Sequence, residues 1–271
     1  MKRETIDLKT SKDQHLMTNH ETIEKIVDAA SIKRGDRVVE IGAGEGALTK
    51  KLVMKGARIT AIEMDERFKG PLGKLNYGNV EIIYGNALDI IDKIEFNKIV
   101  SNIPYSICEP LLSKLGGRNF DLAVISIPEN FYKTISSRPG EKNYSVLTIK
   151  TESFFRVECK FKIPKGDFNP VPKTESVVVV IKPLSKADYE KDPRKFILRE
   201  IFLQKKKKLG NSLMEALINL NKNISGKNFT KKMARKAIKK MKLGAHLLDK
   251  RPAQMSKEDF GKIKAKLPIS P

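Results

Sequence analysis

Short apolar runs alternate with helical patterns along the first half of the chain. Ile23, Ile26 and Val27 recur at helical spacing after Thr18-Asn19, a pair that can cap a helix. Apolar strands separated by helices are typical of a parallel sheet that is covered on both faces. The predicted strands here are residues 37–41, 58–64, 80–85, 97–102 and 120–127, and the predicted helices are 46–56 and 109–115.

The pattern changes after Tyr144. Residues 154–164 and 176–183 are predicted strands without a strong helix between them, so we expect them to pair antiparallel at the edge of the sheet. From Pro193 to Leu267 the pattern is helical and basic, with no strand signal. The predicted domains are an α/β domain with a mixed seven-strand sheet over residues 1–183 and a small all-helical domain over residues 184–271.

The net charge of the chain indicates what kind of partner it binds. The chain has 53 Lys and Arg against 32 Asp and Glu, a formal charge of +21 at pH 7. Such an excess favours a polyanionic partner, with nucleic acid ahead of a membrane surface. No apolar run approaches the ~18–20 residues of a membrane span, and the first residues lack the apolar core of a signal peptide. Two cysteines and three scattered histidines form no disulfide or metal pattern, which predicts a cytoplasmic protein without a metal site.

A glycine-rich segment, EIGAGEG at residues 40–46, follows the first long strand and opens a helix. Its glycines allow a ligand to approach the backbone, but the GxGxG spacing is not the dinucleotide GxGxxG pattern. Glu63 ends the next strand, where a carboxylate can bind both hydroxyls of a ribose. Gly42, Gly44 and Glu63 together indicate an S-adenosylmethionine site, although a glycine loop alone is compatible with a tight turn. Asn86 ends the third strand and can contact the cofactor's adenine, or it is only a turn-forming asparagine.

The segment SNIPYS, residues 101–106, follows a predicted buried strand. The amino nitrogen of adenine is a weak nucleophile because its lone pair is delocalised into the ring. The Asn102 side-chain oxygen and the backbone carbonyl of Ile103 or Pro104 can accept hydrogen bonds from both amino hydrogens, which frees the lone pair. The Tyr105 ring can stack on the base, and we expect no general base nearby. The alternative is a strand-ending turn with Tyr105 in the core.

A proline-rich loop, DFNPVP at residues 167–172, displays a second aromatic residue, Phe168. A base that is flipped out of its stack is held between two aromatic or apolar faces, and Phe168 can supply one of them. The alternative is an ordinary core phenylalanine.

These segments resemble the small-subunit ribosomal RNA adenine dimethyltransferases, which are related to the macrolide-resistance methyltransferases of the large subunit. The resemblance covers nearly the whole chain and makes Gln14, His15 and Met17 cofactor-binding residues. The matching segments are Gln14–Met17 (Q-N/H-F-L in the family), EIGAGEGALT at 40–49 (the cofactor loop), Asn102–Tyr105 (N-[LI]-P-[YF]) and Phe168–Ser176 (F-x-P-x-P-x-V-x-S).

Two downstream stretches favour the small-subunit branch. FLQKKKKLGNSL, residues 202–213, is similar to the family's F-x-Q-R-R-K-x-L-x-N-x-L helix, and residues 251–260 are similar to its R-x-x-x-L-S-x-E-x-F ending. Four departures stand out: Asn86 replaces the usual aspartate, Thr174-Glu175 replaces the usual valine and its neighbour, SIPENF at 126–131 lacks the glutamine-rich form, and lysines replace arginines. The predicted RNA-binding residues are Lys205, Lys206, Lys207 and Lys208, with a solvated helix face as the alternative.

The resemblance implies a class I methyltransferase (Rossmann-like) fold followed by the helical domain. It also implies methyl transfer from S-adenosylmethionine to the 6-amino nitrogens of two adjacent adenosines in small-subunit ribosomal RNA. The expected partner is that RNA or a pre-ribosomal particle, and the expected form is a cytoplasmic monomer that acts in ribosome biogenesis without a membrane. Two alternatives stay open: a large-subunit ribosomal RNA adenine methyltransferase, and a catalytically inactive RNA-binding assembly factor of the same fold.

Overall fold

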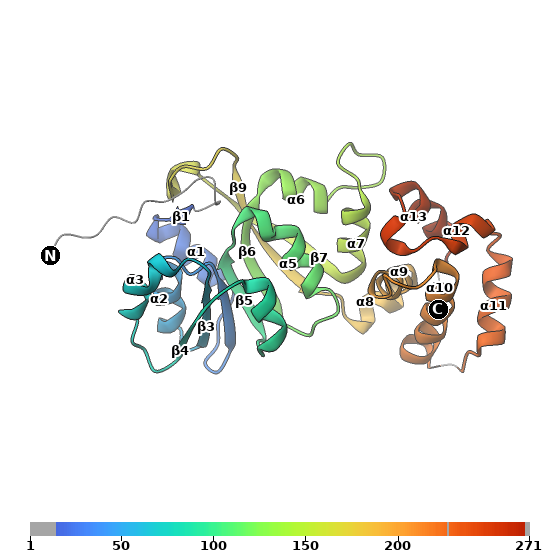
Figure 1. The fold of residues 1–271 in the computed structure, drawn as a ribbon, viewed down its shortest axis with the longest axis horizontal. Coiled ribbons are helices and arrows are strands. Elements are labelled where there is room, and N and C mark those ends of the chain that lie inside the picture. The colour runs from blue at the N-terminus through green and yellow to red at the C-terminus, as the bar shows by residue number, and fades with distance from the viewer. Residues whose placement is uncertain (1–14, 227, 269–271) are drawn as a thin grey trace. The chain divides into compact units, whose positions relative to one another are not determined.

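The computed structural model describes residues 15–226 and 228–268 (Figure 1). Contacts between residues divide the chain into two compact units. The sheet unit comprises the chain up to Tyr132 together with Val157–Lys182, and the helical unit comprises Lys133–Arg156 together with the chain from Pro183 onward. The helical unit therefore includes a segment that lies well before the predicted boundary at residue 183.

Seven strands form one mixed sheet, as the sequence predicts. They are β2 (Arg37–Ile41), β3 (Arg58–Glu63), β4 (Val80–Tyr84), β5 (Lys98–Asn102), β6 (Leu122–Pro128), β7 (Phe155–Ile163) and β9 (Ser176–Pro183). Their order across the sheet is β4-β3-β2-β5-β6-β9-β7, which places β7 at the edge beside β9. The pairs from β4 to β6 are parallel and β9 runs antiparallel to β6, so the carboxyl ends of β2 to β6 lie along one edge of the sheet.

A second, two-stranded sheet was not predicted. It pairs β1 (Leu16–Met17) antiparallel with β8 (Phe168–Asn169), in the register Leu16 to Asn169 and Met17 to Phe168. The Thr18 N–H extends the pairing by donating to the carbonyl of Asp167 at 2.8 Å. The amino-terminal motif and the proline-rich loop therefore lie side by side, although they are far apart in the sequence.

Helices lie on both sides of the large sheet (Figure 1). They are α1 (His20–Ala29), α2 (Ala47–Met54), α3 (Lys69–Gly73), α4 (Ala87–Ile90), α5 (Cys108–Leu115) and α6 (Glu129–Ile135). Val38, Val100 and Val124 pack in one core cluster with residues of α1 and α2. Val39 and Ile99, one position along β2 and β5, are buried on the opposite face, as the two-residue period of a strand requires. The predicted cap of α1 is confirmed, since the Asn19 side chain accepts hydrogen bonds from two backbone N–H groups of its first turn.

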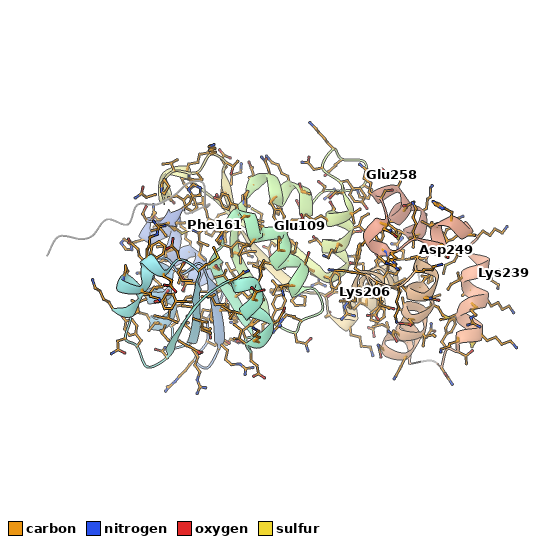
Figure 2. All side chains as sticks on the ribbon, viewed as in Figure 1. Glu109, Phe161, Lys206, Lys239, Asp249 and Glu258 are labelled. Carbon is orange, nitrogen blue, oxygen red and sulfur yellow. The ribbon has the colours of Figure 1, made fainter. Side chains whose placement is uncertain are left out.

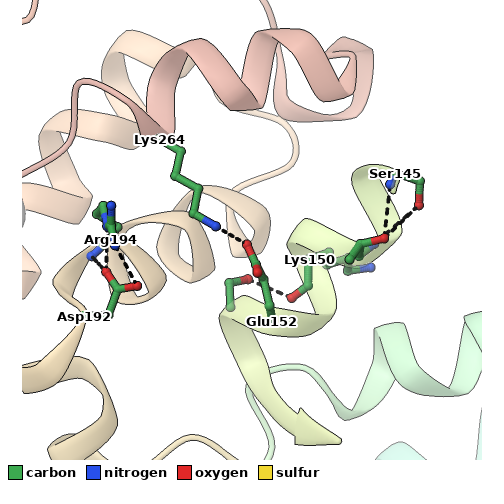
Figure 3. A network of polar contacts seen from close by, with 8 residues as sticks. Ser145, Lys150, Glu152, Asp192, Arg194 and Lys264 are labelled. Atoms are coloured by element: carbon green, nitrogen blue, oxygen red, sulfur yellow. Dashed lines mark hydrogen bonds and ion pairs between the residues drawn. The ribbon is translucent and has the colours of Figure 1, made fainter. Parts of the chain in front are cut away.

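The carboxy-terminal region is helical, as predicted. The elements of the helical unit are α7 (Val146–Phe154), α8 (Lys186–Lys191), α9 (Pro193–Leu203), α10 (Leu209–Leu220), the π-helical turn η6 (Asn221–Ser225), α11 (Lys231–Lys240), α12 (Ala245–Asp249) and α13 (Lys257–Lys264). Glu152 on α7 pairs with Lys264 on α13, and Asp192 pairs with Arg194 at the start of α9 (Figure 3). Phe202 and Phe260 stack with ring centroids 4.7 Å apart. The Glu152–Lys264 pair therefore ties the early segment to α13, and the Phe202–Phe260 stack ties α9 to α13.

The prediction of one helix across residues 202–213 is wrong. α9 ends at Leu203, α10 begins at Leu209, and residues 204–208 form the connection between them. Lys205 and Lys208 would lie on the same face of such a helix, one turn apart, where two like charges are unfavourable. The Leu209 N–H donates instead to the carbonyl of Lys250 at 2.8 Å. Within the described residues, the model contains no helix with the length and apolar character needed to cross a membrane.

Candidate active site

A pocket of about 520 Å³ opens in the sheet unit at the carboxyl ends of β2, β3, β4 and β5. Open α/β sheets bind their ligands at this position, and the volume is within the range of about 300–1,000 Å³ typical of small-molecule sites. His15 and Leu16, from the segment around β1, form a further part of its wall. The pocket therefore combines four strand ends with a segment from the start of the described chain.

The loop between β2 and α2 turns through three glycines in the left-handed region. The φ angles of Gly42, Gly44 and Gly46 are +73°, +54° and +77°. A Cβ atom on Gly44 would lie 2.6 Å from Leu16 Cδ2, so a side chain there would displace Leu16 and would also strain the left-handed backbone. The Gly42 N–H donates to the carbonyl of Ile62 at 2.7 Å and fastens the loop to the end of β3. Gly42 and Gly44 therefore present bare backbone to the pocket.

Glu63 is fixed at the end of β3 by two backbone donors. Its Oε2 accepts a hydrogen bond from Gly44 N–H at 2.8 Å, and its Oε1 accepts one from Asp65 N–H at 2.8 Å. The side chain is buried and lines the pocket. Each carboxylate oxygen can accept a second hydrogen bond. The carboxylate is therefore oriented to bind a pair of hydroxyl groups.

Glu40, at the start of the glycine-rich segment, lies behind this loop and is fully buried on β2. Burial raises the pKa of Glu40 to about 8; the hydrogen bond from Thr49 opposes this shift and the nearby Glu63 carboxylate adds to it. The Thr49 hydroxyl donates to Glu40 Oε2 at 2.6 Å. Because the side chain holds its proton at neutral pH, the buried site carries one negative charge fewer than its sequence suggests.

Asn86 combines the two roles that the sequence left open. Its side chain lines the pocket, and its Oδ1 accepts a hydrogen bond from Leu88 N–H at 3.0 Å as the N-cap of α4. The cap leaves the amide NH2 group and one oxygen lone pair for a ligand.

Asn102 is held at both ends of its amide. Its Nδ2 donates to the backbone carbonyl of His15 at 2.9 Å, and its Oδ1 accepts a hydrogen bond from the Ser126 hydroxyl. One residue earlier, the Ser101 hydroxyl accepts from Ile41 N–H at 3.1 Å and donates to Ile41 O at 2.5 Å. These contacts tie the end of β5 to the end of β2, to β6 and to the β1 segment.

Tyr105 projects from the short turn after Pro104 and lines the pocket. Its hydroxyl is hydrogen-bonded to the hydroxyl of Ser176, which is buried at the start of β9. One face of its ring stacks against His15, with centroids 5.8 Å apart and planes inclined by 30°. A hydroxyl contact at one end and a ring contact on one face hold Tyr105 in position for stacking.

His15 brings an imidazole to the pocket wall beside the SNIPY segment. Its ring lines the pocket beside Tyr105, and its Nδ1 lies 2.8 Å from the carbonyl oxygen of Pro170. A carbonyl only accepts hydrogen bonds, so Nδ1 is the donor in this contact. An imidazole is therefore present in the pocket.

Most of the predicted site residues lie together. Those that line the pocket are His15, Gly42, Gly44, Glu63, Asn86, Asn102, Pro104 and Tyr105. Gln14 lies outside the described residues. Met17 does not line the pocket; its side chain belongs to the hydrophobic core.

Phe168 also lies in the core. Its side chain is 2% exposed, it packs in the same core cluster as Met17, and it does not line the pocket. Register explains this position, because Phe168 pairs directly with Met17 between β8 and β1. The alternative left open by the sequence, a core phenylalanine, describes its place in this structure, and its stacking role stays a prediction.

Several pocket or supporting residues were not predicted. Leu16 covers the glycine loop, and Met64 lines the pocket with 70% of its surface exposed. Ser126 is hydrogen-bonded to Asn102, and Ser176 is hydrogen-bonded to Tyr105. The sequence carries one usable signal, since Ser126 is the sole polar residue in the run LAVISIP and a buried hydroxyl needs a partner.

The predicted RNA-binding lysines lie in the connection between α9 and α10. All four are exposed, but two have carboxylate partners: Lys207 with Glu215 at 2.6 Å and Lys208 with Asp249 at 2.8 Å. Figure 2 labels Lys206 in this connection and Lys239 on α11, and shows side chains projecting outward along α11. Among the described residues, no group of three or more His, Cys, Asp and Glu side chains is arranged to hold a metal ion.

Comparison with known proteins identifies the family of this chain. The family model described as "Ribosomal RNA adenine dimethylase" matches residues 6–248. A relative from Thermococcus onnurineus, named "Probable ribosomal RNA small subunit methyltransferase A", is 33% identical over 258 residues, covering 95% of this chain and 91% of the relative. A dimethyladenosine transferase from Plasmodium falciparum has a similar crystal structure, with a TM-score of 0.62 and 30% identity over 92% of this chain and 96% of that chain.

The fold comparison extends to the 23S rRNA methyltransferase ErmE, with a TM-score of 0.57 and 22% identity over 93% of this chain and 99% of that chain. These likenesses confirm the predicted class I methyltransferase fold with a helical carboxy-terminal region. The family match covers most of the chain, and the relative extends it through the last helices. The chain belongs to the ribosomal RNA adenine dimethylase family.

Proposed function

We propose that the protein transfers methyl groups from S-adenosylmethionine to the 6-amino nitrogens of two adjacent adenosines in small-subunit ribosomal RNA, as a cytoplasmic monomer acting in ribosome biogenesis. The observation that carries this proposal is the Asn102 amide, which is held at both ends in the wall of a pocket at the carboxyl edge of the sheet. The cofactor, when bound, supplies an electrophilic methyl group attached to a sulfonium sulfur. The target is the RNA itself or a pre-ribosomal particle.

The pocket fits a nucleoside cofactor. Glu63 turns a carboxylate with two free acceptor positions toward it, and Gly42 and Gly44 leave the neighbouring backbone uncovered. Asn86 adds an amide at the end of β4. We assign Glu63 to the ribose hydroxyls and Asn86 to the adenine, with Met64 as an apolar contact.

The SNIPY segment acts on the target amine. The Asn102 oxygen has one lone pair engaged by Ser126, which leaves the other for an amino hydrogen of the target. The carbonyl of Ile103 or Pro104 would accept the second hydrogen, which leaves the nitrogen lone pair available. With the cofactor bound, the N–CH3 bond would form as the methyl–sulfur bond breaks to leave a neutral thioether, and the amine would release one proton to water. The Tyr105 ring stacks on the flipped base.

RNA affinity is proposed to come from two basic surfaces of the helical unit. The first is the predicted connection 205–208. The second, which we call the α11 face, consists of Lys231, Lys232, Arg235, Lys236, Lys239 and Lys240, all on the basic helix α11. Two of the four lysines in the connection are ion-paired to carboxylates, which moderates the charge of the first surface. Phosphate contacts are electrostatic and position the RNA without reading its sequence.

The large-subunit alternative is weaker because ErmE, at 22% identity, shares the fold alone, whereas the Thermococcus relative is 33% identical over 95% of this chain. The discriminating experiment offers isolated small and large ribosomal subunits to the purified protein with methyl-labelled cofactor and maps the modified bases. Methylation of two adjacent adenosines in the small subunit is expected. Methylation of the large subunit alone would replace this proposal with the alternative.

The assembly-factor alternative is tested by calorimetry and by Asn102→Ala. The wild-type protein is expected to bind S-adenosylmethionine, and Asn102→Ala is expected to bind it within several-fold of wild type. Its turnover should fall by a factor on the order of 10²–10³ or more, as on removal of other preorganised polar contacts. Near-normal methylation by this variant would reject the role of Asn102, and a wild-type protein that binds RNA but no cofactor would favour the assembly factor.

A further inference from the structure

Ser126 is a buried hydroxyl in the middle of an apolar strand. β6 has the sequence LAVISIP, and the serine side chain is completely buried. It lies directly opposite Asn102 in the parallel register of β5 and β6. Cross-strand partners point to the same face of a sheet, so the two side chains meet.

The surroundings of Asn102 fix which end of its amide faces Ser126. The backbone carbonyl of His15 lies 2.9 Å from one end of the amide and can only accept a hydrogen bond. The NH2 group must therefore point at His15, and the oxygen must point at Ser126. The Ser126 hydroxyl then has to donate its proton to Asn102 Oδ1. The reverse orientation would set two acceptors against each other.

We infer that Ser126 is a positioning residue for methyl transfer: it holds the Asn102 oxygen in the direction from which the target amine is bound. This inference rests on the proposed function, since it assigns Ser126 to the amide that we assign to the amine. The His15 carbonyl restrains only the nitrogen end of the amide. Without the hydroxyl, the oxygen has no donor holding it, and the amide can rotate about its last side-chain bond.

The expected effect of Ser126→Ala is therefore on the chemical step. We expect kcat to fall roughly 10- to 100-fold, which is the range for loss of an orienting partner or a misplacement of about 1 Å. The Kd for S-adenosylmethionine and the KM for small subunits should stay within about threefold of wild type, because no residue assigned to ribose, adenine or phosphate is changed.

A matched control separates this role from the general cost of removing a buried hydroxyl. Ser153 is also completely buried, and its hydroxyl donates to the carbonyl of Lys150 at 2.7 Å inside the helical unit. Ser153→Ala should lose a comparable hydrogen bond and leave kcat unchanged. Urea unfolding of both variants shows whether they fold. If Ser126→Ala does not fold, Ser126→Cys replaces it, because a thiol keeps a weak donor in a similar volume. Its kcat should then fall less than the roughly 10- to 100-fold expected for complete loss of the donor.

The decisive measurement is a double-mutant cycle under single-turnover conditions with methyl-labelled cofactor. If Ser126 acts through Asn102, Ser126→Ala added to Asn102→Ala should cause no further loss of rate. Equal, additive losses in both backgrounds would overturn the inference, and so would a Ser126→Ala variant with wild-type kcat. Failure of the proposed function looks different, because then the wild-type protein itself does not methylate adjacent adenosines of the small subunit, whereas failure of the role of Asn102 leaves Asn102→Ala with near-normal activity.

Discussion

Replacing Asn86 by aspartate should tighten cofactor binding without changing the fold. The structure makes this substitution informative, because the side chain both caps α4 and lines the pocket. Aspartate and asparagine are about equally good caps, so Asn86→Asp keeps the hydrogen bond to Leu88 N–H. What changes is the acceptor offered to the cofactor's adenine amine.

The magnitude follows from the change in acceptor charge. A neutral hydrogen bond contributes about 0.5–1.5 kcal/mol net, and one to a charged group about 1.5–3 kcal/mol. The expected gain is therefore about 1 kcal/mol, or roughly fivefold in Kd. The pocket has three other carboxylates. Asp65 pairs with Arg67 at 2.6 Å and Glu66 pairs with Lys69 at 3.0 Å, which moderates their repulsion, and the Glu63 carboxylate accepts hydrogen bonds from the backbone N–H groups of Gly44 and Asp65.

Calorimetric titration with S-adenosylmethionine measures this directly, with thermal unfolding recorded in parallel. Asn86→Ala is the matched control: it removes both the cap, at about 0.5–2 kcal/mol of stability, and the acceptor, so both its Tm and its affinity should fall. If Asn86→Asp binds the cofactor no more tightly than wild type while its Tm is unchanged, the adenine assignment of Asn86 is refuted and its role is that of a cap.

Three further predictions address the rest of the site. Tyr105→Ala should weaken binding of the target base by about 1–3 kcal/mol and leave cofactor affinity unchanged. Phe168→Ala, which empties a core position, should instead lower the free energy of unfolding in urea by about 3–5 kcal/mol, and a stable Phe168→Ala protein that has lost only activity would restore the stacking role of Phe168. Replacement of the four lysines at 205–208 by glutamine, or of four cations on the α11 face, should reduce the slope of log binding constant against log salt concentration for RNA by about 0.7–0.9 for each phosphate that is no longer neutralised. An unchanged slope would show that the replaced cations are solvated and do not contact RNA. The pKa of Glu40 is about 8 in the folded protein and near 4.5 in the unfolded chain, so the folded state holds the extra proton between these pH values and the free energy of unfolding should fall by up to about 1.4 kcal/mol per pH unit across them. Glu40→Gln should abolish that fall, and urea midpoints with the same pH dependence in both proteins would contradict the raised pKa of Glu40.

Local patterns were sufficient for the sheet and for most of the pocket. The largely buried strands of the large sheet, β2, β3, β5, β6 and β9, were predicted from short apolar runs, because a strand that is covered on both faces carries apolar side chains along most of its length. The glycine loop, Glu63 and Asn102 were found for a related reason: parallel strands put their carboxyl ends on one edge, so residues that follow separate strands converge there. Sequence order alone implies this convergence.

The sequence did not determine which residues contact and position the side chains at that edge of the sheet. Register decides that Ser126 faces Asn102 and that Phe168 faces Met17, and a shift of one residue would turn either side chain to the other face. His15 was predicted only through the family resemblance of residues 14–17; the physical cause of its place in the pocket is the pairing of β1 with β8, which composition and periodicity do not encode. The helical unit shows the same limit, since the basic run at 205–208 was visible in the sequence but its carboxylate partners come from other helices. Composition and periodicity thus determined the elements and the chemistry available, whereas long-range pairing, which depends on the free energy of the whole fold, decided which side chains meet.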